Sequence, residues 1–95
     1  MIVIAGPLYV DPAERGEYLA RTFDVAVQAR AASGCLDFVQ APDPVDPSRI
    51  NVFEVWETDD DVQRFRAGGF EPDRALPRIV RADVQLYRIA AIEAP

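Results

Sequence analysis

The sequence predicts an α+β fold in which a four-stranded antiparallel sheet carries helices on one of its faces. Three observations predict it. The 95 residues suffice for a single hydrophobic core, so one domain is expected over residues 1–95. Segments with strand and helix periodicity follow one another in the order βαββαβ. The third strand is apolar on both of its faces, which is typical of a strand that is covered on both sides.

The chain opens with an apolar, β-branched segment over residues 2–10, which predicts the first strand. Because Pro7 has no N–H to donate to a neighbouring strand, we expect a bulge or an edge position near Gly6 and Pro7. Asp11 is suited to cap a helix that has Pro12 in its first position. We expect this helix to continue to about residue 32. Its apolar face is expected to consist of Leu19, Phe23, Ala26 and Val27.

Gly34 is suited to end the first helix in a left-handed conformation. A second strand is expected over residues 35–41, in which Leu36 and Phe38 alternate with Cys35, Asp37 and Val39. The prolines within residues 42–47 exclude regular structure, so a loop is expected before the third strand at 49–57. In that strand the even positions share one face. They are Ile50, Val52, Glu54 and Trp56.

Thr58 and the three acidic residues after it predict the start of a second helix, which Gly68 and Gly69 end. A short further helix is expected within residues 70–80, carrying Leu76 and Ile79, and a fourth strand over residues 83–92. This order of elements is the ferredoxin-like split βαβ unit. Because the helices cover one sheet face only, a second copy of the chain is the expected cover of the other face, and we expect a homodimer.

The composition excludes several classes of active site. The chain has no His and no Lys, and Cys35 is its one cysteine, so a Ser-His-Asp triad, a His-ligated metal, a Lys Schiff base and an intrachain disulfide are impossible. The net charge of −6 argues against nucleic acid and against an anionic membrane surface as partners. Without a visible leader or membrane span, a cytoplasmic location is expected. No metal site is expected either, because the acidic run at 59–61 is explained by helix capping.

The central part of the sequence carries a recognisable pattern. It reads GCLDF at 34–38, DPVDP at 43–47 and FEVWE at 53–57. In these blocks and their spacing the chain resembles the antibiotic biosynthesis monooxygenase family. The resemblance implies a dimeric ferredoxin-like α/β barrel. It also implies oxygenation of aromatic polyketides or quinols with O₂ and no metal, flavin or haem, although other members degrade haem or isomerise small signalling molecules.

The sequence departs from the family pattern at three positions. Relatives commonly carry a His in the helix after the tryptophan and another just beyond that helix, where this chain has Phe65 and Gly69. The haem-degrading branch uses the second His as its iron ligand, so the resemblance disfavours that branch. The cofactor-free oxygenases have been linked to an Asn four positions before the tryptophan, where this chain has Val52. No cofactor is therefore expected, and no catalytic residue is assigned.

Three aromatic residues are candidates for binding a flat aromatic substrate. Trp56 is either a stacking wall for the ligand or a large residue of the core. Tyr9 and Tyr87 can each donate a phenolic hydrogen bond to a ligand oxygen, or they are ordinary half-buried tyrosines of strands.

Three polar residues complete the candidate site. Arg88 either holds a phenolate or pairs with Glu54. Asn51 either orients a carbonyl group or merely begins a strand. Glu54 is either a base with a raised pKa in a pocket or a member of a buried ion pair.

The function expected from these residues is cofactor-independent oxidation of an aromatic, quinol or polyketide-type molecule with O₂. An electron-rich phenol or quinol can itself reduce O₂ once it is deprotonated, so the protein has only to bind it, favour the anion and exclude water. Two alternatives stay open. One is an isomerase or cyclase on the same scaffold, and the other is a module that binds a small molecule or dimerises without chemistry.

Overall fold

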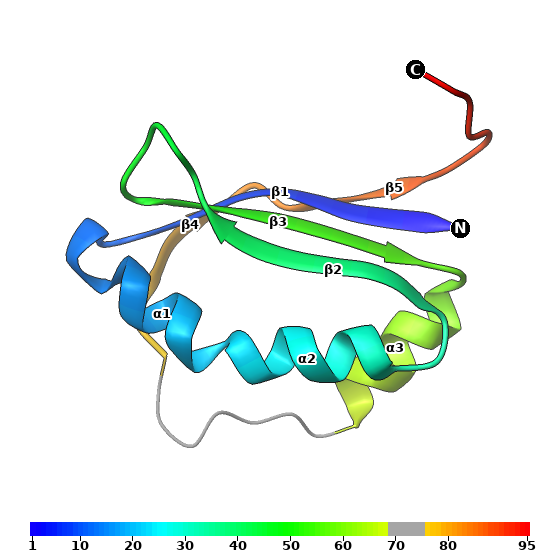
Figure 1. The fold of residues 1–95 in the computed structure, drawn as a ribbon, viewed down its shortest axis with the longest axis horizontal. Helices are drawn as coiled ribbons and strands as arrows, with labels where there is room; N and C mark the ends of the chain where they lie inside the picture. The colour runs from blue at the N-terminus through cyan, green and yellow to red at the C-terminus, as the bar shows by residue number, and fades with distance from the viewer. Residues whose placement is uncertain (69–75) are drawn as a thin grey trace.

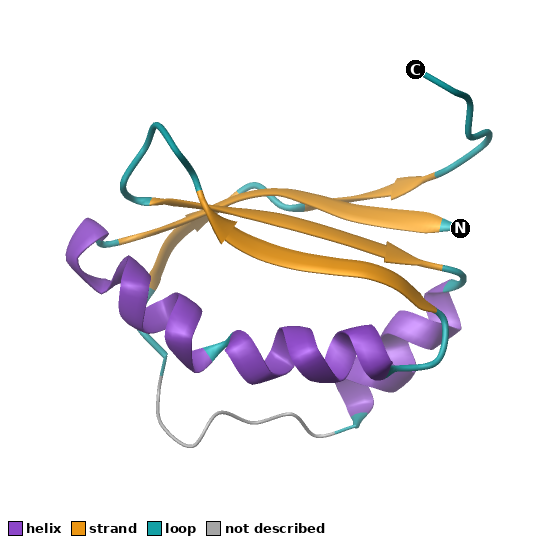
Figure 2. Cartoon of the chain, viewed as in Figure 1, coloured by secondary structure: helices purple, strands orange, loops and turns teal. Residues whose placement is uncertain are grey.

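The computed structural model describes residues 1–68 and 76–95. One sheet lies against one layer of helices (Figure 1, Figure 2). The strands are β1 (Ile2–Val10), β2 (Cys35–Pro42), β3 (Arg49–Trp56), β4 (Ile79–Ala82) and β5 (Gln85–Arg88). The helices are the 3₁₀ turn η1 (Pro12–Glu14), α1 (Arg15–Arg21), α2 (Phe23–Ala31) and α3 (Asp59–Ala67). None of the helices in the described ranges is both long and apolar enough to span a bilayer.

The sheet has the order β2-β3-β1-β4, and β5 pairs with the other end of β1. All of these pairings are antiparallel, so β4 and β5 together take the place of the fourth strand and the predicted ferredoxin-like fold is confirmed. The fourth strand begins at Ile79, earlier than predicted, and is interrupted at Asp83 and Val84.

The interruption lies opposite Gly6 and Pro7, where an irregularity was expected. Gly6 has φ +142, and a Cβ there would collide with the carbonyl oxygen of Asp83. The backbone N–H of Asp83 donates to the carbonyl oxygen of Pro7 at 2.8 Å. The irregularity is therefore a close approach of two backbones in the middle of the sheet, and it is not an edge position, because β1 pairs on both sides.

The first helix differs most from its prediction. It is divided at Thr22, whose hydroxyl donates to the carbonyl oxygen of Tyr18 at 2.9 Å. Phe23 and Val27, expected in the core, are 66% and 53% exposed. The sheet instead receives a face that begins with the buried Tyr18 and Thr22 and continues with small side chains, which allow close packing. The members of this face on α2 and just after it are Val25, Ala26, Ala29 and Ala32.

Two further predictions are corrected. A bulge between Cys35 and Asp37 turns Leu36 outward, so that it is 49% exposed while Phe38 is buried. A short helix was predicted within residues 70–80, and residues 70–75 of that range lie outside the described residues. The prediction is wrong at the end of the range, because Ile79 belongs to strand β4, where β-branched residues pair with β1.

The alternation predicted for β3 is confirmed. Its even positions face the helices and are buried, and the side chain of Phe53 on the opposite face is 42% exposed. The helices therefore cover one face of the sheet, which we call the inner face (Figure 2). The core on this face has two centres, one around Trp56 and one around Ile50. The opposite face, here the outer face, carries no helix of the described residues.

Candidate functional site

Glu54 and Trp56 form a hydrogen-bonded pair beneath the helices. They are two positions apart on β3 and 8% and 0% exposed, and Trp56 Nε1 donates to Glu54 Oε1 at 3.0 Å. Burial raises the pKa of the Glu54 carboxyl, and the indole hydrogen bond and the charge of Arg66 oppose this rise only in part. Within the described part of the chain Glu54 belongs to no ion pair. A carboxyl in such a place can exchange a proton with a bound molecule.

Gln40 adds a second polar group to the inner face. In the register of β2 and β3 it lies opposite Val52, and Phe38 lies opposite Glu54, so Gln40 and Glu54 are diagonal neighbours. The side-chain oxygen Oε1 of Gln40 is buried and has no hydrogen-bond donor among the described residues. Gln40 was not among the residues predicted for the site, although a glutamine two positions after Phe38 breaks the apolar pattern of an inner face and was a usable signal.

Tyr18 was missed as well. It is 5% exposed on α1 and packs in the cluster that contains Val52, and burial raises the pKa of its phenol. Tyr18 of α1, Gln40 of β2 and Glu54 of β3 thus lie in the same layer of the molecule, between the sheet and the helices. A polar group in this layer is unusual, because its remaining members are mostly aliphatic and aromatic.

An open cleft of about 280 Å³ lies between the end of α2 and α3. Phe65 forms part of its wall and also packs against Trp56, with ring centroids 5.5 Å apart, and edge-on against Phe38 at 6.4 Å. The Phe65 ring therefore separates the cleft from the buried Glu54–Trp56 pair. The other lining residues are Gln28, Ala32, Ser33, Asp61, Arg64 and Gly68.

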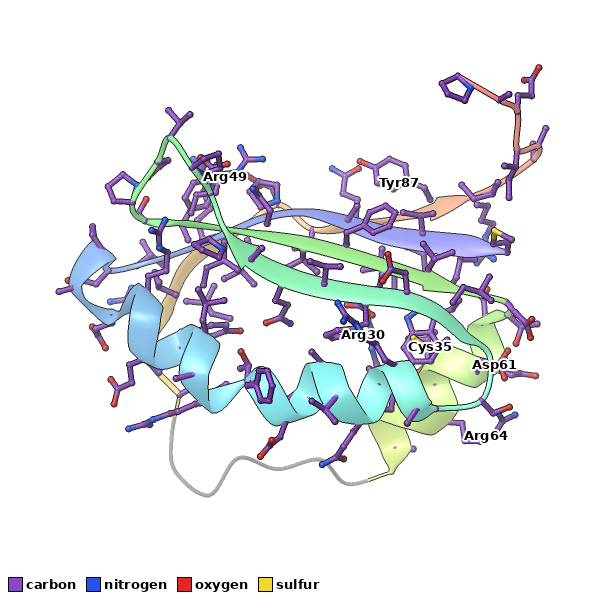
Figure 3. All side chains as sticks on the ribbon, viewed as in Figure 1. Arg30, Cys35, Arg49, Asp61, Arg64 and Tyr87 are labelled. Carbon is purple, nitrogen blue, oxygen red and sulfur yellow. The ribbon has the colours of Figure 1, made fainter. Side chains whose placement is uncertain are left out.

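One rim of the cleft is fixed by Asp61. Its carboxylate accepts hydrogen bonds from Thr58 Oγ1 at 2.7 Å and from Arg64 Nη1 at 3.0 Å, and both hold its pKa below the ordinary value. Gly34, in the predicted left-handed conformation with φ +82, leaves the space that Asp61 occupies. Asp61 and Arg64 lie beside each other at the end of the helical layer (Figure 3).

One of the two interpretations of Arg88 was an ion pair with Glu54, but Arg88 pairs with Asp59 instead. Both of its terminal nitrogens donate to Asp59, at 2.9 Å each, in an exposed bidentate ion pair between β5 and α3. This bond lowers the pKa of the Asp59 carboxyl. Arg88 therefore lies at the margin of the inner face, and its guanidinium is already engaged.

The other three predicted residues belong to the outer face. Tyr87 lies opposite Val3 there and is 49% exposed (Figure 3). The ring of Tyr9 lies under the guanidinium of Arg81, whose carbon is 4.4 Å from the ring centroid. Asn51 Nδ2 donates to Asp43 Oδ1 at 2.9 Å. Within one chain the sheet separates these residues from Glu54 and Trp56, so the six candidates do not form one pocket.

Neither a metal nor a reactive thiol is suggested by the described residues. They hold no cluster of three metal-ligating side chains. Cys35 is partly buried, and its Sγ donates weakly to the carbonyl oxygen of Asp37 at 3.5 Å. Burial and the charge of Glu54 raise the pKa of this thiol, which disfavours the nucleophilic thiolate.

Comparison with known proteins gives a family and several similar structures. The sequence model of the antibiotic biosynthesis monooxygenase family matches residues 1–69. A candidate antibiotic biosynthesis monooxygenase from Nitrosomonas europaea shares 14% identity, with 96% of this chain and 100% of that one covered and a TM-score of 0.75. A counterpart from Chloroflexus aurantiacus shares 25% identity over 98% and 96% of the two chains, with a TM-score of 0.66.

A third similar structure is the haem degrader MhuD from Mycobacterium tuberculosis, which was solved with two haems in its active site. It shares 20% identity over 99% of this chain and 100% of its own, with a TM-score of 0.70. Identities of 14 and 20% demonstrate a common fold and no more. No curated protein sequence matches the chain.

Proposed function

The chain belongs to the antibiotic biosynthesis monooxygenase family, and we propose that it oxidises an aromatic, quinol or polyketide-type small molecule with O₂. Residues 1–95 act as one domain in this proposal. The observation that carries it is the buried Glu54–Trp56 pair, a carboxyl of raised pKa inside an apolar layer that a single aromatic ring separates from an open cleft.

In the proposed reaction the substrate supplies all the electrons. The Glu54 carboxylate takes the proton of a substrate hydroxyl, for which its raised pKa makes it a better base than an exposed glutamate. The resulting anion reduces O₂. For a hydroquinone, one oxygen atom replaces a ring hydrogen as a hydroxyl, both original hydroxyls become carbonyls, and the second oxygen atom leaves as water. Hydroquinone and O₂ thus give hydroxyquinone and H₂O, and no external reductant is needed.

The substrate is proposed to enter from the cleft. For it to reach Glu54, the Phe65 ring has to move off Trp56, after which the substrate ring takes its place against the indole. The apolar neighbours of the pair, among them Ile4 and Val62, keep water from the reacting anion.

Haem does not fit the residues of this chain. The sequence contains no His, so the usual nitrogen ligand of haem iron is lacking. Cys35 is the one cysteine, and the raised pKa of its thiol disfavours the thiolate that would bind the iron. We therefore propose a reaction without cofactor, in contrast to that of MhuD.

We also propose that a second copy of the chain covers the outer face. Apolar side chains of the three strands β1, β2 and β3 lie together there, and Tyr9, Asn51 and Tyr87 are then residues of the interface. The apolar members are Val3, Ala5, Val39, Phe53 and Val55. Sedimentation at micromolar concentration should give the mass of a dimer for the wild type and of a monomer for Phe53→Glu. A monomeric wild type would rule this out.

A second candidate function is a module that binds the same class of molecule without oxidising it. The lack of His at the two positions where relatives commonly carry one favours this alternative. An isomerase or cyclase, the other alternative, would use Glu54 as its acid or base without consuming O₂.

Oxygen uptake separates these functions. With a hydroquinone or an anthrone, the wild type should consume O₂ faster than the substrate does alone, and Glu54→Gln should lower the rate by about 10²–10⁴-fold. The matched control is Glu57→Gln, an exposed carboxyl just after the same strand, which should leave the rate unchanged. Uptake no faster than autoxidation, or equal rates for the wild type and Glu54→Gln, would refute the proposed oxidation.

A further inference from the structure

We propose that Gln40 positions the substrate and selects one that carries a hydroxyl group, by accepting a hydrogen bond from that hydroxyl at Oε1. The inference rests on the proposed function, since it concerns a ligand of the same site. It assigns a specificity-determining residue that lies outside the motifs from which the family was recognised.

The main observation is an unmet hydrogen bond. Gln40 Oε1 is the only buried side-chain nitrogen or oxygen without a partner in the part of the chain that the structure describes. Such an acceptor costs folding free energy, because in the unfolded chain water would bond to it. An apolar residue would fill this position of β2 without that cost. A ligand that supplies the missing hydrogen-bond donor to Oε1 accounts for a glutamine at this position.

Three donors of the protein in this layer already have hydrogen-bond partners. Arg30 Nε donates to the carbonyl oxygen of Phe38 at 2.8 Å, and the Thr22 hydroxyl donates to that of Tyr18 at 2.9 Å. Trp56 Nε1 is bonded to Glu54. Figure 3 shows Arg30 between β2 and α2, in the layer that Gln40 faces. None of these three donors is free to move to Gln40 without abandoning an existing bond.

The register places this acceptor beside the proposed base. Diagonal cross-strand neighbours lie about 7–8 Å apart, so one aromatic ring can reach Gln40 and Glu54 together. A carboxamide oxygen only accepts, so it discriminates in favour of a ligand that donates. A hydroxyl held at Gln40 fixes the ring while a second oxygen function meets Glu54. A methyl ether of the same ring system has no hydroxyl hydrogen to donate to Gln40 or to Glu54.

Binding without turnover tests this inference. Under anaerobic conditions, calorimetric titration with 1,4-naphthohydroquinone and with its dimethyl ether measures the preference for the hydroxyl. The wild type should bind the hydroquinone about tenfold more tightly or better. Gln40→Leu and the less branched Gln40→Met should reduce this preference several-fold, and the part that remains comes from the second hydroxyl at Glu54. The control Gln63→Leu, an exposed glutamine on α3, should keep the wild-type preference.

Stability gives a second readout. Gln40→Leu or Gln40→Met should unfold at the same temperature as the wild type or higher, because the unmet acceptor is gone. A preference as large in both variants as in the wild type would overturn the inference, as would a wild type that binds neither compound or binds both equally. If the wild type consumes O₂ and the variants keep the full preference, the role of Gln40 alone fails. If the preference is reduced in the variants but no O₂ is consumed, the oxidation alone fails.

Discussion

Two polar clusters on the same pair of strands are built in opposite ways. In the loop between β2 and β3, the Asp43 carboxylate accepts hydrogen bonds from the backbone N–H groups of Val45 and Asp46 at 3.0 and 2.8 Å and from Asn51 at 2.9 Å. Arg15 Nη1 adds bonds to three carbonyl oxygens of the loop region, at 2.8 to 3.3 Å. On the inner face, Glu54 has one hydrogen bond and Gln40 Oε1 has none.

The difference appears in the acidity of the two carboxyls. Asp43 keeps access to water and gains donors, mainly Asn51, so its pKa is lowered to about 2. Glu54 loses water and gains one donor, so its pKa is raised. A residue of a family motif can therefore be purely structural when its hydrogen bonds are satisfied within the protein, as for Asp43 in the DPVDP loop. Buried groups with unmet bonds are better candidates for contact with a ligand.

The largest effect is expected from removing the partner of Glu54. Trp56→Ala should lower the free energy of unfolding by about 3–5 kcal/mol, because it empties the centre of one core cluster and leaves Glu54 without its donor. Urea unfolding measures the loss. Trp56→Phe, which keeps an aromatic ring and removes the N–H, should cost less. Equal losses for the two variants would show that ring packing is unimportant.

A smaller effect is expected at the loop. Arg15→Ala should lower the free energy of unfolding by about 1–3 kcal/mol, because the guanidinium is the shared donor of three carbonyl oxygens. Oxygen uptake should be unchanged, since the loop cluster is separate from Glu54. Arg15→Lys, which keeps the charge but not the planar fork, should fall between the wild type and Arg15→Ala. A variant that folds normally and loses turnover would contradict the division between the two clusters.

The smallest effect is a pH dependence of stability. Because the pKa of Glu54 is raised on folding, the folded state holds the proton more tightly than the unfolded state. The wild type should therefore lose stability as the pH rises above 4.5, the ordinary value of this carboxyl, until Glu54 is ionised in both states. Glu54→Gln should lack this loss in urea unfolding from pH 4 to pH 8. Parallel curves for the two proteins would contradict the raised pKa.

The sequence was sufficient for the parts of the fold that repeat locally. Period-two alternation placed Glu54 and Trp56 together on one face of β3, and the capping residues located both ends of α3. It failed where one residue changes the phase of a pattern. Thr22 divides the first helix and leaves Phe23 outside, and a bulge turns Leu36 outward.

The candidate site was harder to predict, because its members meet only through the sheet register. The residues around Gln40 in the sequence do not predict that Val52 lies opposite it on β3, or that Glu54 is its diagonal neighbour. Tyr9 and Tyr87 were attractive as aromatic residues with hydroxyls, yet strand parity places them on the outer face. Composition was informative about what the site does not bind, since a chain without His lacks the common ligand of haem iron.

The most direct test of the contrast between the two clusters is a single NMR titration of the side-chain carboxyl carbons of the whole chain. Glu54 should titrate above 4.5, the ordinary value of its carboxyl, and Asp43 should titrate at about 2. Adding a non-oxidisable hydroxylated aromatic should move the Glu54 signal and leave that of Asp43 in place. A Glu54 that titrates at or below 4.5 would contradict the account, because the inner face would then hold an ordinary, hydrated carboxylate.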